Sequence, residues 1–396
     1  MIDVSFFIPI YNPNPGWLDE AVESIVRLCQ KSKVKTELLL GDDGSPVNCR
    51  DLLAGYQKKY PDFVRVFCFE KNEGIGATST KLAKEAKGRY IASFDQDDIM
   101  LPFDLDEEIK ILDENPQYSA SYAQKFLFNE YGLTGEVHGD IWSDFLAFFQ
   151  PKVNINAMLI RRETLASHDY FKPLPGYRIY HDTWLMIRLA EDGDLLYRNH
   201  APRSLYRFHS SQNSSRYEED NWEWHLTGQD VITRHGELYR GILLGENLPE
   251  GKNARENALI DRLTGLAFFL NQQRRILAVQ LIEKTVARFP LDPGAHQIRL
   301  LYHRLDKGEI FDRMYGEAMS RFPKNTEAQL LFLDAKLQRD QKFRVRDDAV
   351  IQKYAELMRL RTMPTQTVSD VLKNMRFQQR PAPVRYSFNL PKPKAK

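Results

Sequence analysis

The chain has 396 residues, 42% hydrophobic and 28% charged, which is the composition of a globular protein of about two or three domains. The formal net charge of +1 gives no electrostatic reason to expect a nucleic-acid partner. The three cysteines have no metal-ligand spacing, and so few thiols indicate a reducing compartment rather than a disulfide framework.

The N-terminal part of the chain alternates between short apolar runs and amphipathic helical patterns. The apolar runs are rich in β-branched and aromatic residues, which predicts buried strands at residues 4–10, 37–40, 64–69 and 90–94. Strands that alternate with helices at this spacing indicate an open, largely parallel sheet. From about residue 115 to 216 the pattern is mixed, and we take this segment as the second half of the same domain.

After about residue 253 the strand signals end and helical periodicity dominates. Ala287-Arg288-Phe289-Pro290 recurs as Ser320-Arg321-Phe322-Pro323, a period of about 33 residues with a helix stop and a new helix start in each copy. This spacing is close to that of tetratricopeptide (TPR) repeats, although a generic helical bundle with a chance match is the alternative. The region could dock a protein partner, support self-association, guide an acceptor polymer or serve as a brace, and the sequence does not choose between them.

The last residues form a basic segment that contains several prolines, and residues 375–396 carry no acidic side chain. We expect a disordered tail, either simply solvated or weakly attracted to an anionic membrane surface. No segment approaches the roughly 20 apolar residues of a spanning helix, and the N-terminus lacks a signal-peptide pattern. We therefore expect a cytoplasmic protein, either free or peripheral on the inner face of the membrane.

Polar residues follow the predicted strands where ligands of such sheets bind, beyond the carboxyl ends. They are Tyr11-Asn12, Asp42-Asp43, Asn72 to Gly76 and Asp95 to Asp98. In Asp95-Gln96-Asp97, two carboxylates separated by one residue point to the same side of an extended chain. Such oxygens suit Mg²⁺ or Mn²⁺, which could hold a diphosphate, although acidic surface turns without a metal are common.

Two glycine-containing turns are less specific. In Asp42-Asp43-Gly44-Ser45, a carboxylate could accept the imide N–H of a uracil or thymine base, or it could cap a helix and form a turn. Asn72-Glu73-Gly74-Ile75-Gly76 lacks the lysine of a P-loop and the third glycine of a dinucleotide fingerprint. Its glycines more simply permit close backbone approach, with a helix N-terminus facing the ligand.

Two later elements could complete a reaction centre. Asp182 follows His181 at the start of an apolar helix, where a carboxylate is either an N-cap or a general base for an acceptor hydroxyl. In Tyr206-Arg207-Phe208-His209, the histidine is either structural or a third metal ligand, and Arg207 could meet phosphate.

These elements, in this order and between residues 5 and 215, resemble the family 2 glycosyltransferases of the inverting, GT-A type. The resemblance rests on Pro9-Ile10-Tyr11-Asn12, Asp42 to Ser45, Asn72-Glu73-Gly74, Asp95 to Asp98, His181-Asp182 and Tyr206 to His209. It implies an α/β fold with a Rossmann-like GT-A domain at residues 1–240. The helical pattern and the composition add an all-α, TPR-like domain at 250–362 and the tail at 363–396. One departure is His181, where the family often has Glu.

The resemblance also implies roles for single residues. The nucleotide-sugar donor, UDP- or dTDP-linked, would be held by Pro9, Tyr11, Asn12, Asp42, Asp43, Asn72, Gly76, Asp95, Gln96 and Asp97. Mn²⁺ or Mg²⁺ would be bound by Asp97, with Asp95 and His209. Asp182 would be the catalytic base for an acceptor that is a glycan or is lipid-linked, as in bacterial surface polysaccharide synthesis.

Two other functions fit parts of the pattern. A nucleotidyltransferase also combines an α/β sheet with carboxylate-bound magnesium, but it needs a basic glycine-rich loop where this chain has Tyr11-Asn12-Pro13. A catalytically inactive scaffold of the same fold, acting through its helical domain, is the second alternative.

Overall fold

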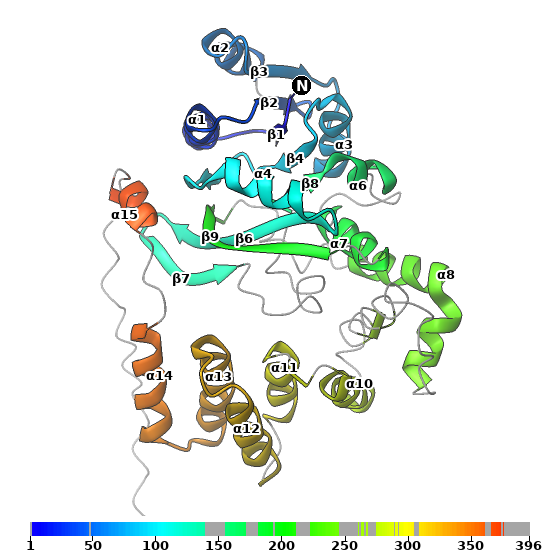
Figure 1. Ribbon diagram of the computed structural model, residues 1–396, viewed down its shortest axis with the longest axis vertical. Helices are drawn as coiled ribbons and strands as arrows, with labels where there is room; N and C mark the ends of the chain where they lie inside the picture. The colour runs from blue at the N-terminus through cyan, green and yellow to red at the C-terminus, as the bar shows by residue number, and fades with distance from the viewer. Residues whose placement is uncertain are drawn as a thin grey trace, which may run out of the picture.

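The computed structural model describes most of the chain as a sheet-based domain joined to a row of helices (Figure 1). The described residues are 2–46, 49–138, 155–171, 181–192, 195–210, 222–244, 260, 263–264, 267, 275–288, 290–291, 293–304, 309–360, 366–373 and 375. No helix within these ranges is long and apolar enough to cross a membrane.

The first half of the sheet domain is parallel, as predicted. Its elements are β1 (Val4–Ile10), α1 (Pro15–Lys31), β2 (Thr36–Asp42), α2 (Arg50–Lys59), β3 (Val64–Cys68), α3 (Ile75–Glu85) and β4 (Tyr90–Ser93). The strands lie in the order β3-β2-β1-β4 with every pair parallel. All seven residues of β1 are buried, because helices cover both faces, and this explains its continuous apolar run.

The second half extends the same sheet with antiparallel pairs and one parallel pair, β6 with β9. It comprises β5 (Ile99–Met100), α4 (Leu105–Glu114), β6 (Tyr118–Asn129), β7 (Gly132–His138), β8 (Leu159–Arg161), α6 (Arg162–Ser167), α7 (His181–Glu191) and β9 (Leu195–Arg207). The order continues β4-β8-β6-β9-β5, with β7 on β6. The short turn between β4 and β5 therefore joins strands that are separated in the sheet by β8, β6 and β9.

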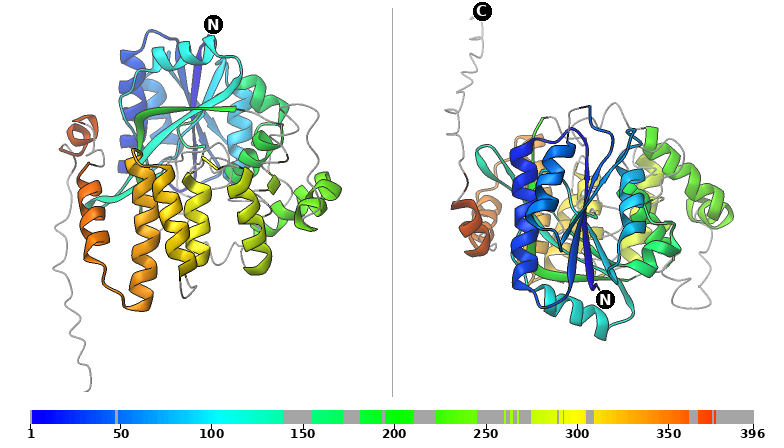
Figure 2. Two further views of the ribbon diagram at one scale, coloured as in Figure 1. Left: turned by 60° about the horizontal axis from the view of Figure 1, so that its bottom comes forward. Right: turned by 90° about the horizontal axis from the view of Figure 1, so that it is seen from above.

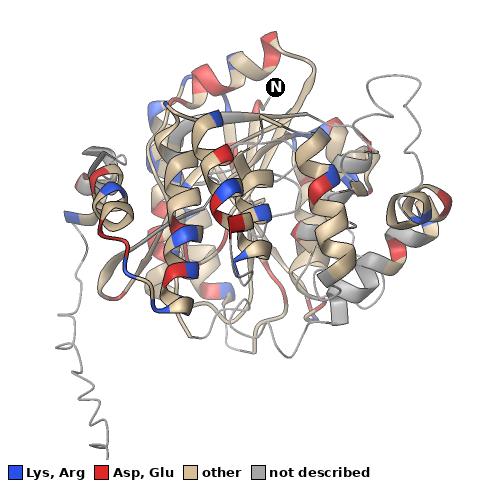
Figure 3. Ribbon diagram, turned by 90° about the horizontal axis from the view of Figure 1, so that it is seen from below, with Lys and Arg blue, Asp and Glu red and all other residues tan. Residues whose placement is uncertain are grey.

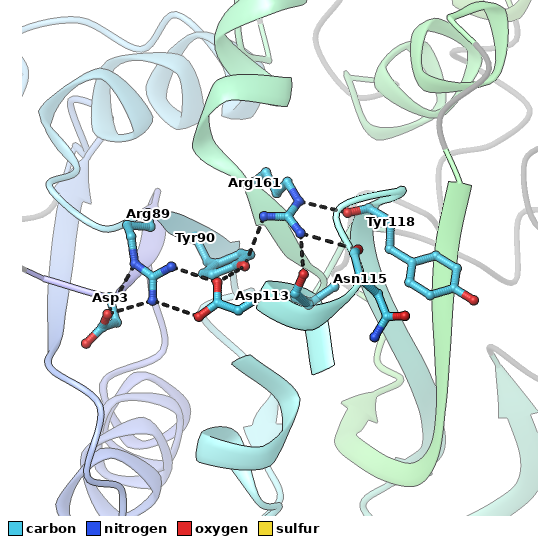
Figure 4. Close-up of polar contacts among 8 residues, drawn as sticks. Asp3, Arg89, Tyr90, Asp113, Asn115, Tyr118 and Arg161 are labelled. Carbon is cyan, nitrogen blue, oxygen red and sulfur yellow. Dashed lines mark hydrogen bonds and ion pairs between the residues drawn. The ribbon is translucent and has the colours of Figure 1, made fainter. Parts of the chain in front are cut away.

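Polar contacts link the elements at the N-terminal ends of β1 and β4, on the side of the sheet opposite that turn (Figure 4). The Arg89 guanidinium bridges Asp3 at 2.9 Å and Asp113 at 2.7 Å, and the Tyr90 hydroxyl donates to Asp113 at 2.7 Å. Arg161 donates to the Tyr118 carbonyl at 2.8 Å. These bonds fix the N-terminal ends of β1 and β4 against α4. The carboxyl ends of the strands, on the opposite side, stay open to a ligand.

The helical region comprises α8 (Trp222–Leu244), α10 (Arg275–Arg288), α11 (Pro293–His303), α12 (Glu309–Arg321), α13 (Thr326–Phe343) and α14 (Asp348–Leu360). Helices α10 to α14 stand side by side below the sheet (Figure 2). Acidic and basic residues are interspersed along these helices (Figure 3). One buried apolar cluster runs from Phe7 and Ile91 in the sheet through α7 and α8 to α10 and α11, so the two regions share a core.

The internal repeat has a structural counterpart. Its two copies end α10 and α12, and in each a side chain six residues after the proline bonds back to the proline carbonyl. His296 Nε2 lies 3.0 Å from the Pro290 oxygen, and Gln329 Nε2 donates to the Pro323 oxygen at 2.8 Å. Because the two copies make equivalent contacts, the sequence repeat corresponds to a repeat in the structure. Its assignment to the TPR class stays a prediction.

The range predicted as a disordered tail contains a helix, which corrects part of that expectation. In α15 (Gln366–Lys373), Val368 is fully buried against Phe126, Phe128 and Leu205, strand residues of the sheet domain. Val371, Leu372 and Met375 pack beside it, which completes an apolar face at helical spacing. The composition of the whole tail hid this short pattern, and residues 376–396 lie outside the described part of the chain.

We expect Val368→Asp to weaken the sheet domain, because a charge at this position cannot stay in the apolar cluster and α15 must detach. The free energy of unfolding should fall by about 1.5–3 kcal/mol, the contribution of one buried valine-sized side chain. Urea unfolding followed by tryptophan fluorescence measures this. Lys373→Ala, on the exposed face of the same helix, is the control, and equal stability of both variants would show that α15 does not support the sheet.

Candidate functional site

The loops after β1, β2 and β4 are linked by side-chain to backbone hydrogen bonds. The Gln96 amide accepts from the Tyr11 N–H at 3.0 Å and donates to the Tyr11 carbonyl at 3.1 Å. The Asn12 N–H donates to Ser45 Oγ at 2.8 Å. The structure therefore brings three of the predicted polar segments to one edge of the sheet, where Tyr11 remains 46% exposed.

Asp42 and Asp43 are both buried and both hold loops. Asp42 Oδ1 accepts from the backbone N–H of Ser45 at 3.1 Å and from its hydroxyl at 2.6 Å. The two oxygens of Asp43 accept from the backbone N–H groups of Glu73 and Gly74, at 3.0 and 2.9 Å. Burial raises the pKa of Asp43, and these hydrogen bonds partly offset the rise.

The turn around Gly44 allows the loop before α3 to approach this closely. Gly44 has a φ of 65°, and a Cβ there would lie 2.7 Å from the carbonyl carbon of Lys71. No residue with a side chain fits without moving that loop. Asn72 is exposed beside it, and Gly76 is buried in the first turn of α3.

The turn between β4 and β5 meets the end of β9. His209 Nε2 lies 2.8 Å from Asp97 Oδ2, and the His209 ring packs on Trp17 with centroids 4.7 Å apart. Arg207 Nε donates to the Asp97 carbonyl at 2.7 Å, and its Nη2 lies 2.5 Å from Glu20. Arg207 thus joins the turn to α1, and its contact with phosphate stays a prediction.

Asp98 is fully buried at the base of the same turn. Its Oδ1 accepts from the Arg207 N–H at 2.8 Å, and its Oδ2 accepts from the side-chain amide of Asn156. Burial, with the charges of Asp97 and Asp95, raises the pKa of Asp98 well above its usual range. Asp98 therefore fixes the turn from below, while Asp97 stays accessible above it.

A buried lysine joins the predicted carboxylates in one electrostatic cluster. Burial raises the pKa of Asp95 to about 7, Asp97 and Asp182 add to the rise, and Lys125 opposes it. Burial lowers the pKa of Lys125 to about 8, against the attraction of Asp98, Asp95 and Asp182. Asp182, in the first turn of α7, thus lies within electrostatic reach of the Asp95 to Asp98 turn.

Sequence reasoning missed Lys125 and Asn156. Lys125 stands in the middle of a buried strand, directly before the apolar run Phe126-Leu127-Phe128, and a charge in such a place is a usable signal. Asn156 had no local signal, because its partner Asp98 is 58 residues away.

The Asp97–His209 pair fits a divalent cation in part. Among the residues that the structure describes, no group of three or more His, Cys, Asp or Glu side chains is gathered as metal ligands. A preformed cage is not required, since Mg²⁺ typically takes one or two carboxylates and completes its shell with substrate phosphates and water. A carboxylate beside an imidazole is also an acceptable donor set for Mn²⁺.

Comparisons with known proteins agree with this geometry. Residues 5–156 match the family model described as glycosyl transferase family 2. An uncharacterized glycosyltransferase of Methanocaldococcus jannaschii is 29% identical over 46% of this chain and 63% of its own length. The minor teichoic acid biosynthesis protein GgaB of Bacillus subtilis is 31% identical over 34% of this chain and 14% of its own. The chain thus spans less than two thirds of either relative.

A structural comparison covers more of the chain. A crystal structure of S. aureus TarS 1-349 in complex with UDP-GlcNAc has a TM-score of 0.50 at 14% identity, over 81% of this chain and 92% of that one. At this identity the likeness shows the fold alone, and the fold agrees with the GT-A domain predicted from the sequence. Within this fold, residues 5–156 are similar to glycosyl transferase family 2.

Proposed function

We propose that the chain moves a sugar from a nucleotide diphosphate to an acceptor hydroxyl, with inversion at the anomeric carbon. The observation that carries this proposal is that the loops after β1, β2 and β4 meet at the carboxyl ends of the strands, where Asp97 lies 2.8 Å from His209. Asp182, in the first turn of α7, is the candidate base that a single displacement needs. The similarity of residues 5–156 to glycosyl transferase family 2 supports the reaction class.

For the donor, we favour a UDP- or dTDP-linked sugar. The exposed Tyr11 ring and the neighbouring Asn12, together with Pro9, Asp42, Asp43, Asn72 and Gly76, border the edge where the base and ribose would lie. The TarS fragment of similar fold was solved with UDP-GlcNAc, which makes this the first donor to test. GgaB, a relative named for minor teichoic acid biosynthesis, supports a glycan or lipid-linked acceptor in surface-polymer synthesis.

The chemistry follows from the positions of the carboxylates. The Asp182 carboxylate takes the proton of the acceptor hydroxyl as its oxygen bonds to the anomeric carbon. The bond from that carbon to the diphosphate breaks on the opposite face, and the electron pair leaves with the phosphate oxygen. Mn²⁺ or Mg²⁺ held by Asp97, with His209 and Asp95, would neutralise the departing diphosphate. The Gln96–Tyr11 and Asp98–Arg207 bonds keep the turn rigid during this step.

We expect Asp97→Ala to abolish metal-dependent nucleotide binding. The variant loses the accessible carboxylate of the turn, so UDP affinity in the presence of Mn²⁺ should fall at least about tenfold. Titration calorimetry of UDP with and without Mn²⁺ measures this, with Asp62→Ala, an exposed carboxylate before β3, as the control. If the wild type binds neither UDP, dTDP nor GDP with the metal, the inactive-scaffold function replaces this proposal.

Asp182→Asn should separate binding from chemistry. The amide cannot accept the acceptor's proton, so kcat should fall by about 10²- to 10⁴-fold while UDP affinity changes less than about threefold. The release of UDP from UDP-GlcNAc, with water as the acceptor, gives the rate. A variant that keeps wild-type kcat would show that Asp182 is only a helix cap.

A further inference from the structure

The first turn of α1 carries a tryptophan that faces the end of β9. Asn14 caps this helix, because its side-chain oxygen accepts from the backbone N–H groups of Gly16 at 3.0 Å and of Trp17 at 3.2 Å. The backbone of Trp17 is therefore fixed, although the residue is only half-buried. The sequence patterns assigned no role in the site to this tryptophan.

Trp17 contacts two residues that stand two positions apart at the end of β9. The centroids of the Trp17 and His209 rings lie 4.7 Å apart, with the ring planes inclined at 45°. The guanidinium carbon of Arg207 lies 5.1 Å from the centroid of the Trp17 ring. Residues two positions apart on an extended chain point to the same side, which explains how one indole reaches both. Glu20, one helical turn after Trp17, lies 2.5 Å from Arg207 Nη2, so one face of α1 holds the segment that carries His209.

This contact bears on the donor atoms of the candidate metal site. His209 Nε2 lies 2.8 Å from Asp97 Oδ2, and the side chains of His209 and Asp97 are 15% and 23% exposed, so both stay partly accessible. An imidazole that turned freely about its side-chain bonds would adopt this orientation only part of the time. An aromatic contact shifts such an equilibrium by about two- to tenfold. A bound cation also withdraws electrons from the imidazole, which strengthens its attraction to the electron-rich indole.

We propose that Trp17 is a positioning residue, which orients the His209 imidazole so that His209 and Asp97 present their donor atoms together to a divalent cation. This inference rests on the proposed function, in which the cation binds with the nucleotide-diphosphate donor. Without the indole, the imidazole loses the surface on which it packs and turns away from Asp97 more often. The cation then binds more weakly, since contacts that orient a metal ligand typically contribute about 10- to 100-fold to metal affinity.

Trp17→Leu should weaken metal binding while the fold is kept. Leucine is apolar and favours a helix, but it has no ring to pack on the imidazole. At a fixed concentration of UDP, we expect the dissociation constant of Mn²⁺ to rise about 5- to 10-fold, with the melting temperature near that of the wild type. The electron paramagnetic resonance signal of free Mn²⁺, compared with a titration of UDP alone, measures this constant without turnover. Trp17→Phe, which keeps an aromatic ring, should stay within about threefold of the wild type.

Two further variants make the test specific. Gln30→Leu, at an exposed position near the other end of α1, is the matched control and should bind Mn²⁺ as the wild type does. In the background of His209→Ala, adding Trp17→Leu should weaken Mn²⁺ binding by less than about twofold more, because a residue that acts through His209 has nothing left to orient.

Each result has one meaning. If Trp17→Leu keeps its Mn²⁺ affinity within about twofold, if Trp17→Phe binds as weakly as Trp17→Leu, or if the losses multiply in the double variant, the positioning role is wrong while the glycosyl transfer stands. If the wild type releases UDP from UDP-GlcNAc without binding Mn²⁺, the metal site and this inference are wrong, and the transfer again stands. If the wild type neither binds Mn²⁺ with UDP nor releases UDP from any UDP-sugar, the proposed function itself fails.

Discussion

The buried carboxylate of Asp98 is the constraint on which the site depends. It is fully inaccessible, and it accepts the backbone N–H of Arg207 and the side-chain amide of Asn156. These two bonds tie the turn after β4 to the end of β9 and to the segment that leads into β8. Arg207 continues the link to the Asp97 carbonyl and to Glu20 on α1. Because the turn is held from below, Asp97 can stay accessible above it.

Burying several carboxylates in one place has an electrostatic consequence. Desolvation and mutual repulsion raise the pKa of Asp95 to about 7 and raise that of Asp98 well above its usual range. Such a cluster favours the binding of protons or of cations, because each removes repulsion between the negative charges. Lys125 opposes this repulsion, although burial lowers its own pKa to about 8.

The parts of the fold that obey local rules could be predicted from the sequence. Continuous apolar runs predicted the parallel strands, because both faces of the sheet are covered. Ligands of such sheets bind beyond the carboxyl ends of the strands, and this rule predicted that Tyr11, Asp42 and Asp95 lie close together there. The missed features are products of long-range pairing. The cross-strand position of Lys125 depends on the register of β6 and β9, and Asn156 meets Asp98 across 58 residues. Neither the register of these strands nor the Asn156–Asp98 hydrogen bond produces a periodic pattern in the sequence.

The helical region is less separate than its composition suggests. Its first helices share an apolar cluster with the sheet through α7 and α8, and at the far end α15 returns to pack on Phe126, Phe128 and Leu205. Phe126 directly follows Lys125, and Leu205 stands two residues before Arg207. The strands that carry Lys125 and Arg207 are therefore supported from behind by a helix more than 100 residues later in the sequence. Because α15 completes the core under the site, a boundary drawn at the change of composition would divide one packed unit.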